Sequence, residues 1–285
     1  MKIQDALADY LVQLEADGRS KHTVGQYSRF LTQLGLWMER VLGSPELDAL
    51  RHQELARFLV SDDATKKVDG KPKKPSSMNA LRSCVRAFFI YCEVADYTAK
   101  NPARLVKRAV VGEPAIRSLS EREVGLLRSA LAQATSPSER RDRVLIELML
   151  RTGVRLASAL ALEVQELELD DGLAYVLHMK RGKQMTVRLD GPLVELLREH
   201  VGDETYGPLF LNDDGEPLSD RSVQRRFKRW LDRAGIRRPA SPHALRHTFA
   251  TRMYEQTRDL ELVRVAMGHA SVATTGRYAM TARGR

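Results

Sequence analysis

Residues 101–124 read NPARLVKRAVVGEPAIRSLSEREV, and this stretch separates two parts of the chain with different sequence patterns. Pro102 ends the preceding segment, and Gly112 and Pro114 interrupt regular structure further on, because glycine and proline are the strongest local breakers. Ser120 followed three residues later by Glu123 is typical of a capping box at the start of a helix. The stretch therefore predicts a linker over 106–117 between a first domain, 1–105, and a second domain, 118–285.

The first domain has the periodicity of helices throughout. In residues 22–43, and again in residues 75–97, apolar side chains recur every three or four positions and so share one helix face. Thr23 is expected to cap the first of these helices. Shorter helices are expected near 3–16 and 52–61. We expect an all-helical domain of four or five helices.

The second domain combines helices with one small sheet. Helical patterns occur near 120–133, 137–152, 191–201, 219–234, 243–256 and 259–268. Residues 172–189 alternate instead: Ala174, Val176 and His178 share one face, and Gly182 lies in a basic turn, which is typical of a β-hairpin. The expected fold class is therefore mostly α, with an all-helical N-terminal domain and a mixed, mainly helical domain that carries a small antiparallel sheet.

The composition favours a polyanionic partner. The 285 residues have a formal net charge of +9, and both domains are basic. Cys84 and Cys92 fit an apolar helix face and lack the spacing of a zinc site, so we expect buried thiols. The N-terminus carries acidic residues unlike a signal peptide, and no apolar run approaches the ~18 residues of a membrane span, so we expect a cytoplasmic protein.

Residues 243–251, HALRHTFAT, place His243 and His247 on one face of an expected helix, with Arg246 between them. A zinc hydrolase needs a glutamate after the first histidine as general base, and Ala244 stands there, so no metal is expected. Arginine is the preferred residue for bidentate contact with phosphate oxygens. Arg246 and His243 therefore suit a phosphate under attack, although ordinary structural helices also carry such pairs.

Further motifs in the second domain extend this pattern. Thr152–Arg155 read TGVR directly after an apolar helix, Lys180 lies in the basic turn, Met267–His269 read MGH, and Tyr278 follows that histidine by nine residues. In this order and spacing, together with HALRHTFAT, the chain resembles the tyrosine recombinases, the phage-integrase and Xer family of site-specific DNA recombinases. The resemblance covers almost the whole chain, since the helical first domain is similar to the SAM-like core-binding domain of that family.

The resemblance implies roles for the residues that match these motifs. Tyr278 is the nucleophile that attacks a DNA phosphodiester, forms a 3′-phosphotyrosine link and releases a 5′-hydroxyl. Arg155 and Arg246 hold the non-bridging oxygens of the phosphate, and His269 adds a hydrogen bond to them.

Proton transfer falls to two further residues. The resemblance implies that Lys180 protonates the departing 5′ oxygen and that His243 accepts the tyrosine proton, while His247 supports the site without being catalytic. A phenol has a pKa near 10, so it needs a base or a strongly positive site to attack at neutral pH. Two arginines, a lysine and a histidine supply the charge that metal ions provide elsewhere, so we expect no metal or other cofactor and no need for ATP.

Two positions depart from the family pattern. The family usually has a glutamate three residues after the first arginine, where this chain has Ser158. Loss of that supporting carboxylate is expected to loosen Arg155 or slow cleavage without abolishing it. The family's hairpin often reads GKGxKxR, and within residues 179–185, MKRGKQM, Lys180 aligns best with Lys183 as the alternative.

Basic side chains outside the apolar stripes are the candidate DNA contacts, with a solvated surface that has no partner as the alternative. These candidates are Arg82, Arg86, Lys183, Arg225, Arg226 and Arg229. The resemblance implies a C-shaped clamp around double-stranded DNA. It also implies a homotetramer, or an assembly with a related recombinase, on two inverted-repeat core sites, without membrane contact.

Three functions stay open on the sequence. The first is a site-specific recombinase that resolves chromosome or plasmid dimers, or integrates and excises a mobile element, in the nucleoid-associated cytoplasm. The second is a type IB topoisomerase-like enzyme that uses the same nucleophile to relax supercoils. The third, a DNA-binding module without catalysis, is disfavoured by the intact set of six catalytic candidates.

Overall fold

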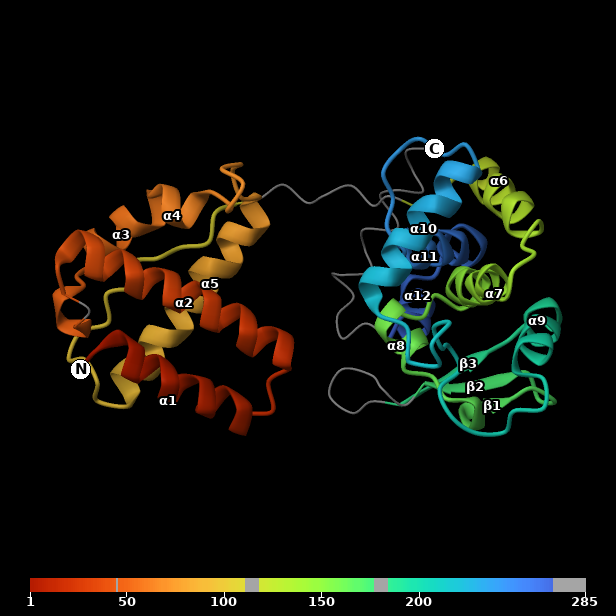
Figure 1. The fold of residues 1–285 in the computed structure, drawn as a ribbon, viewed down its shortest axis with the longest axis horizontal. Helices are drawn as coiled ribbons and strands as arrows, with labels where there is room; N and C mark the ends of the chain where they lie inside the picture. Colours follow the sequence, from red (N-terminus) through yellow and green to blue (C-terminus); the bar gives the residue numbers. More distant parts are fainter. Residues whose placement is uncertain (45, 111–117, 177–183, 269–285) are drawn as a thin grey trace. The chain divides into compact units, whose positions relative to one another are not determined.

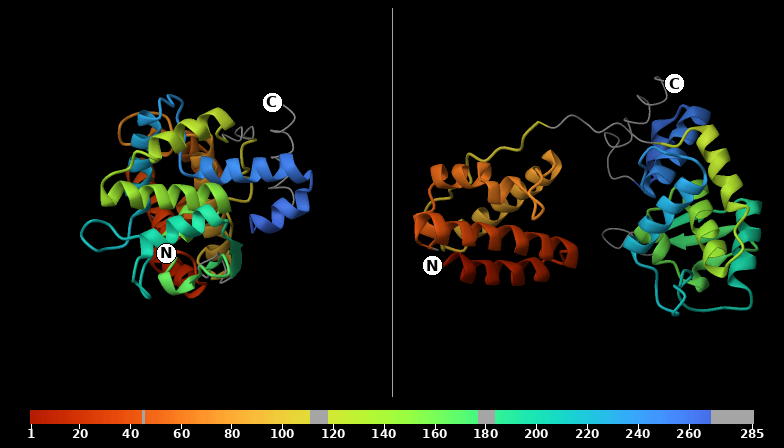
Figure 2. Two further views of the ribbon diagram at one scale, coloured as in Figure 1. Left: turned by 90° about the vertical axis from the view of Figure 1, so that its right-hand side faces the viewer. Right: turned by 45° about the horizontal axis from the view of Figure 1, so that its top comes forward.

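The computed structural model describes residues 1–44, 46–110, 118–176 and 184–268. The chain divides into two compact units, Met1–Glu113 and Pro114–Arg285, which Figures 1 and 2 show in three views. Each unit has a hydrophobic core of its own.

The first unit is built from helices. They are α1 (Ile3–Ala16), α2 (Lys21–Leu42), α3 (His52–Val60), the single turn α4 (Asp62–Thr65) and α5 (Pro75–Val94), with a 3-10 turn at Leu47–Ala49. The helices expected near 3–16, 22–43, 52–61 and 75–97 are thus confirmed.

Helix α2 begins earlier than its sequence pattern indicates. Ser20 has an extended backbone, and its hydroxyl accepts a hydrogen bond from the Thr23 amide at 3.3 Å. The expectation that Thr23 caps this helix is therefore wrong, because Thr23 already belongs to the first helical turn. Two hydroxyl residues three positions apart both fit the cap pattern, and only the backbone distinguishes them. At the other end, Gly43 terminates α2 with a φ of +66°.

Aromatic rings and both cysteines fill the first core. The ring of Tyr10 on α1 meets Phe88 on α5 at a centroid distance of 5.5 Å, and Phe88 packs against Phe89. Cys84 and Cys92 lie beside them with no exposed surface, which confirms the expectation of buried thiols. Burial raises the pKa of both thiols, that of Cys92 to about 12, so both stay protonated.

The second unit contains seven helices and a small sheet within its described residues. The helices are α6 (Glu121–Leu131), α7 (Pro137–Thr152), α8 (Leu156–Leu160), α9 (Gly191–Val201), α10 (Asp220–Arg233), α11 (His243–Thr257) and α12 (Leu260–Ala266), with a 3-10 turn at Val164–Glu166. The strands are β1 (Leu167–Glu168), β2 (Leu173–Val176) and β3 (Met185–Arg188). The capping box at the start of α6 is formed by Ser120 and Glu123 as expected.

The sheet is antiparallel in the order β1-β2-β3. Ala174 of β2 faces Val187 of β3, and both side chains are buried, which confirms the expected β-hairpin. His178 and the basic tip of the hairpin lie outside the described residues.

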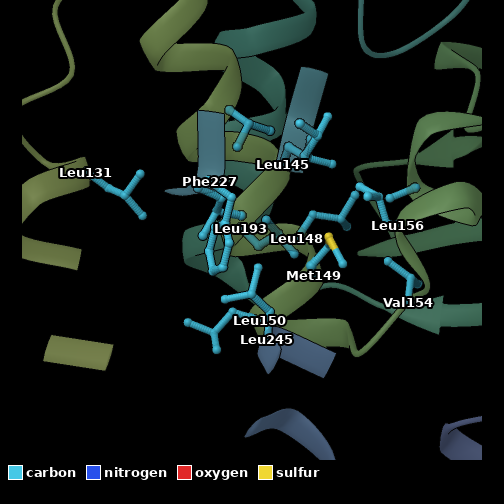
Figure 3. Packing of buried hydrophobic residues seen from close by; sticks show 14 of the residues in the cluster. Leu131, Leu145, Leu148, Met149, Leu150, Val154, Leu156, Leu193, Phe227 and Leu245 are labelled. Carbon is cyan, nitrogen blue, oxygen red and sulfur yellow. The ribbon is translucent and has the colours of Figure 1, made fainter. Parts of the chain in front are cut away.

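Helix α7 is the central element of the second unit. Ten of its sixteen residues are buried, so it is surrounded by other elements rather than lying on the surface. It packs against α6, α8, α9, α10 and α11. Figure 3 shows Leu145, Leu148 and Leu150 of this helix beside Phe227 of α10 and Leu245 of α11. Because α7 touches so many elements, its C-terminal end has a fixed place in the unit.

Candidate active site

The structure describes three of the six catalytic candidates. Arg155 precedes α8, His243 begins α11, and Arg246 lies one turn further along α11. Lys180, His269 and Tyr278 lie outside the described residues, as does the alternative lysine Lys183. The geometry of the site is therefore built from the TGVR and HALRHTFAT segments.

The end of α7 is shaped by a glycine. Gly153 caps the helix with a φ of +68°, a conformation that favours glycine. An added Cβ would lie 2.9 Å from Cε1 and Cγ of Phe249 on α11, and closer still to Cδ1. Two features therefore require glycine at this position of the TGVR motif. They are the left-handed backbone conformation and the tight contact with the helix of the HALRHTFAT motif.

Arg246 connects three motif segments. Its side chain is almost fully buried, with a residue exposure of 5%. Nη1 donates to the backbone carbonyl of Gly153, and Nη2 donates to that of Met267 at 2.5 Å. Gly153 lies two residues before Arg155, and Met267 lies two residues before His269. Arg246 therefore fixes the backbone that leads to two other candidate phosphate ligands.

His243 lies within electrostatic reach of both arginines. Partial desolvation of the ring lowers its pKa below the usual value, and the positive charges of Arg246 and Arg155 act in the same direction. The carboxylate of Asp220, the first residue of α10, opposes them. A lowered pKa keeps the imidazole neutral at pH 7, which is the form that accepts a proton.

Ser158 is buried in α8, with a residue exposure of 5%. A hydroxyl thus occupies the interior position at which the family usually has a glutamate. Among the described residues, the second unit buries its carboxylates elsewhere, at Asp142, Glu147 and Glu166.

The candidate DNA contacts on α10 divide into two groups. Arg225 and Arg229 are exposed. Arg226 instead turns inward: its Nε lies 2.7 Å and 2.9 Å from the carboxylate oxygens of Asp142, and its Nη2 donates to the backbone carbonyl of Ser138. Arg226 thus attaches α10 to α7, and its expected DNA contact stays a prediction.

The candidate contacts on α5 also differ from each other. Arg86 is exposed. Arg82 is half-buried and donates to the side-chain oxygen of Asn79 at 3.3 Å. The same Asn79 side chain exchanges two hydrogen bonds with the backbone of Ala109, so it holds the segment that leads out of the first unit against α5.

Sequence reasoning did not identify the buried charges of α7. Asp142 and Glu147 each accept hydrogen bonds from arginines of other elements. The sequence did contain a signal, namely charged residues within an otherwise apolar helix. Because buried charges in proteins are paired, these residues indicate ion pairs with other elements. No cluster of three or more metal-ligating side chains occurs among the described residues, and none of the described helices is long and apolar enough to cross a membrane.

Comparisons with known protein families cover nearly the whole chain. Residues 117–285 match the model of the phage integrase family, and residues 7–93 match the phage integrase N-terminal SAM-like domain. Tyrosine recombinase XerD of Ralstonia nicotianae is 30% identical over 277 residues, which cover 94% of this chain and 87% of that protein. Tyrosine recombinase XerA of Pyrococcus furiosus is 28% identical over 281 residues, covering 96% and 88%.

Two solved structures share the fold. The XerH site-specific recombinase bound to a palindromic difH substrate matches with a TM-score of 0.75 and 23% identity, over 96% of this chain and 82% of that one. A λ integrase fragment (75–356), solved as a dimer bound to a COC′ core site, matches with a TM-score of 0.74 and 21% identity, over 96% and 97%. By the family model and the relatives together, the chain belongs to the phage integrase family of tyrosine recombinases.

Proposed function

We propose that the chain is a site-specific DNA recombinase that cuts and rejoins DNA strands through a 3′-phosphotyrosine intermediate. The observation that carries this proposal is the position of Arg246, which joins the TGVR segment, α11 and the turn before His269 in one site. Relatives at about 30% identity over most of the chain are named tyrosine recombinases. Nothing in the comparisons favours relaxation by a topoisomerase-like enzyme.

The reaction begins with the phenol oxygen of Tyr278, which attacks the phosphorus of a DNA phosphodiester. A bond forms between that oxygen and phosphorus, and the bond from phosphorus to the 5′ oxygen breaks. His243 takes the phenol proton, because its lowered pKa leaves a neutral ring at pH 7. Lys180 delivers a proton to the departing 5′ oxygen. The reverse steps, with a 5′-hydroxyl from another strand, rejoin the DNA.

Positive charge stabilises the transition state. The attacked phosphate gains negative charge in the transition state. Hydrogen-bond donors stabilise that charge most effectively when they are already in position before the reaction. Arg246 meets this condition because its buried guanidinium is held by two backbone carbonyls. Arg155, Arg246 and His269 bind the non-bridging oxygens in the proposed reaction, which needs neither a metal ion nor ATP.

DNA binding is shared between two proposed domains. Residues 1–105 form the core-binding domain, 106–117 the linker and 118–285 the catalytic domain, and we propose that they close around the duplex as a C-shaped clamp. Arg82, Arg86, Lys183, Arg225 and Arg229 are the proposed phosphate contacts. Arg226 is left out because its guanidinium is paired with the buried Asp142.

The proposed assembly is a tetramer on two inverted-repeat core sites, formed by four copies or with a related recombinase. It is supported by the shared fold with a λ integrase tetramer bound to a Holliday junction, with a TM-score of 0.73. The proposed location is the cytoplasm, on the nucleoid. The proposed biological role is resolution of chromosome or plasmid dimers, or integration and excision of a mobile element.

A plasmid assay tests this function. Genomic fragments that the chain binds are selected and sequenced, and two copies of the recovered site are placed in one supercoiled plasmid. We expect strand exchange between the two sites, with the same yield in the presence of EDTA, and no exchange with Tyr278→Phe. Relaxation of a plasmid without the site, in place of exchange between sites, would support a topoisomerase and contradict the proposal.

A further inference from the structure

A buried carboxylate on α7 lies at the centre of a charged network close to the candidate site. The side chain of Glu147 is 6% exposed. It accepts two hydrogen bonds from Arg128 of α6, from Nε at 2.8 Å and from Nη2 at 3.0 Å. It accepts a third from Nε of Arg151, on the last turn of its own helix, at 2.7 Å. Each of these donors is charged, which makes the bonds stronger than neutral ones.

The network continues to a third helix. Nη1 of Arg151 donates to a carboxylate oxygen of Asp190, and the other oxygen of Asp190 caps α9 by accepting from the Leu193 amide. Glu147 and Arg151 therefore tie the last turns of α7 to α6 on one side and to α9 on the other. The C-terminal end of α7 is held from two directions.

The C-terminal end of α7 leads directly into the candidate site. Gly153 follows Arg151 by two residues, and its carbonyl accepts from Arg246. Arg155 follows Gly153 by another two residues. A displacement of the last turn of α7 would therefore move both arginines that bind the phosphate in the proposed reaction.

From this arrangement we propose that Glu147 is a positioning residue for Arg155 and Arg246. Glu147 acts through Arg151 and the carbonyl of Gly153, and it does not touch the DNA. The inference rests on the proposed recombinase function.

The charge state of Glu147 supports this role. Burial alone raises its pKa, but the hydrogen bonds and charges of Arg128 and Arg151 outweigh burial, so its pKa is lowered overall. The carboxylate is therefore charged at neutral pH and binds both arginines continuously.

Three variants separate positioning from general stability. Glu147→Gln removes the charge at nearly constant volume. Arg151→Gln leaves the Glu147–Arg128 pair in place and removes the two ion pairs of Arg151, with Glu147 and with Asp190, so it is the variant of choice if Glu147→Gln does not fold. Arg141→Gln is the matched control, since Arg141 is buried in the same helix but binds Leu211 and Asp213 near the opposite end.

The assay measures cleavage in a single turnover on saturating DNA. The substrate is a duplex that carries the selected site and a nick beside the scissile phosphate, so that the covalent complex accumulates. We expect Glu147→Gln and Arg151→Gln to slow cleavage about 10- to 100-fold, as losses of supporting contacts typically do. DNA affinity should stay unchanged, and Arg141→Gln should cleave at the wild-type rate.

A second substrate distinguishes positioning of the arginines from a general structural defect. A methylphosphonate at the scissile position replaces a charged oxygen by a methyl group, so it removes the charge that the two arginines neutralise. We expect the difference in rate between wild type and Glu147→Gln to shrink on this substrate, and Glu147→Asp to recover part of the rate on the phosphodiester.

The outcomes are distinct. If wild type itself forms no covalent complex, the recombinase proposal fails and not only this inference. If wild type cleaves and Glu147→Gln cleaves equally fast, the inference is wrong. It is also wrong if Arg141→Gln cleaves as slowly as Glu147→Gln. A third contradicting result is that Glu147→Gln reduces the cleavage rate by the same factor on the phosphodiester and on the methylphosphonate.

Discussion

Substitution of Gly153 by alanine tests how closely α7 and α11 are joined at the site. Gly153 has a φ of +68°, and alanine in a left-handed conformation costs roughly 1–2 kcal/mol. The new Cβ would also lie 2.9 Å from two ring atoms of Phe249, and overpacking of this kind costs about 1–3 kcal/mol. We therefore expect Gly153→Ala to destabilise the second unit by about 2–5 kcal/mol.

The first unit offers a matched control. Gly43 ends α2 with a φ of +66°, nearly the same as that of Gly153, but no atom of the described residues lies within 4 Å of its added Cβ. Gly43→Ala should therefore show only the backbone cost of roughly 1–2 kcal/mol. Measured in a Phe249→Ala background, Gly153→Ala should cost only the backbone amount, because the ring that overlaps with the new Cβ is absent.

Denaturant unfolding followed by tryptophan fluorescence measures these differences. Trp37 lies in the first unit and Trp230 in the second, so a Trp37→Phe background reports on the second unit alone, and Trp230→Phe on the first. Because the Gly153 carbonyl also binds Arg246, cleavage should fall together with stability. The reasoning is refuted if Gly153→Ala costs no more than Gly43→Ala.

Three further predictions concern the site and its surroundings. Arg246→Lys should slow cleavage about 100- to 1,000-fold, because a single ammonium group cannot reproduce the planar contacts to two carbonyls and a phosphate; a smaller loss than that of Arg155→Lys would argue against its junction role. Arg229→Gln should weaken DNA binding and reduce the slope of log affinity against log salt concentration by about one. Arg226→Gln should instead destabilise the protein by about 3 kcal/mol, because it leaves Asp142 buried without its cation. Equal effects of the two variants on DNA affinity would contradict this distinction. The pH profile of cleavage should decline only below the usual histidine pKa, since that of His243 is lowered, and Asp220→Asn should shift the decline to still lower pH because Asp220 raises that pKa; an unchanged profile in Asp220→Asn would refute this assignment.

Long periodic segments are predictable because many residues repeat the same signal. The apolar stripes of residues 22–43 and 75–97 correspond to α2 and α5 within a few residues at each end. The elements α4, α8 and β1, by contrast, contain four, five and two residues, too few to show a period of their own. Their conformation depends on what they pack against.

The sequence motifs identified the site residues but not the contacts that hold them. Arg226 and Arg229 look alike in the sequence, and the difference between them is Asp142, which lies 84 residues from Arg226. The same holds for Arg246, whose carbonyl acceptors lie 93 and 21 residues away. Contacts of this kind come from tertiary packing, which no local pattern encodes. The motifs, in contrast, are short segments whose residues can be identified directly in the sequence, and several of them occur in the expected order.

The central claim is that Tyr278 forms a covalent bond to the 3′ phosphate of cleaved DNA. The most direct measurement is mass spectrometry of the covalent complex formed on a nicked duplex, after digestion with nuclease and trypsin. Cleavage after Arg277 and Arg283 releases residues 278–283, YAMTAR, and we predict that this peptide carries the nucleotide on its tyrosine through a 3′ phosphate. A nucleotide on any other residue, or a covalent complex that persists in Tyr278→Phe, would contradict the account.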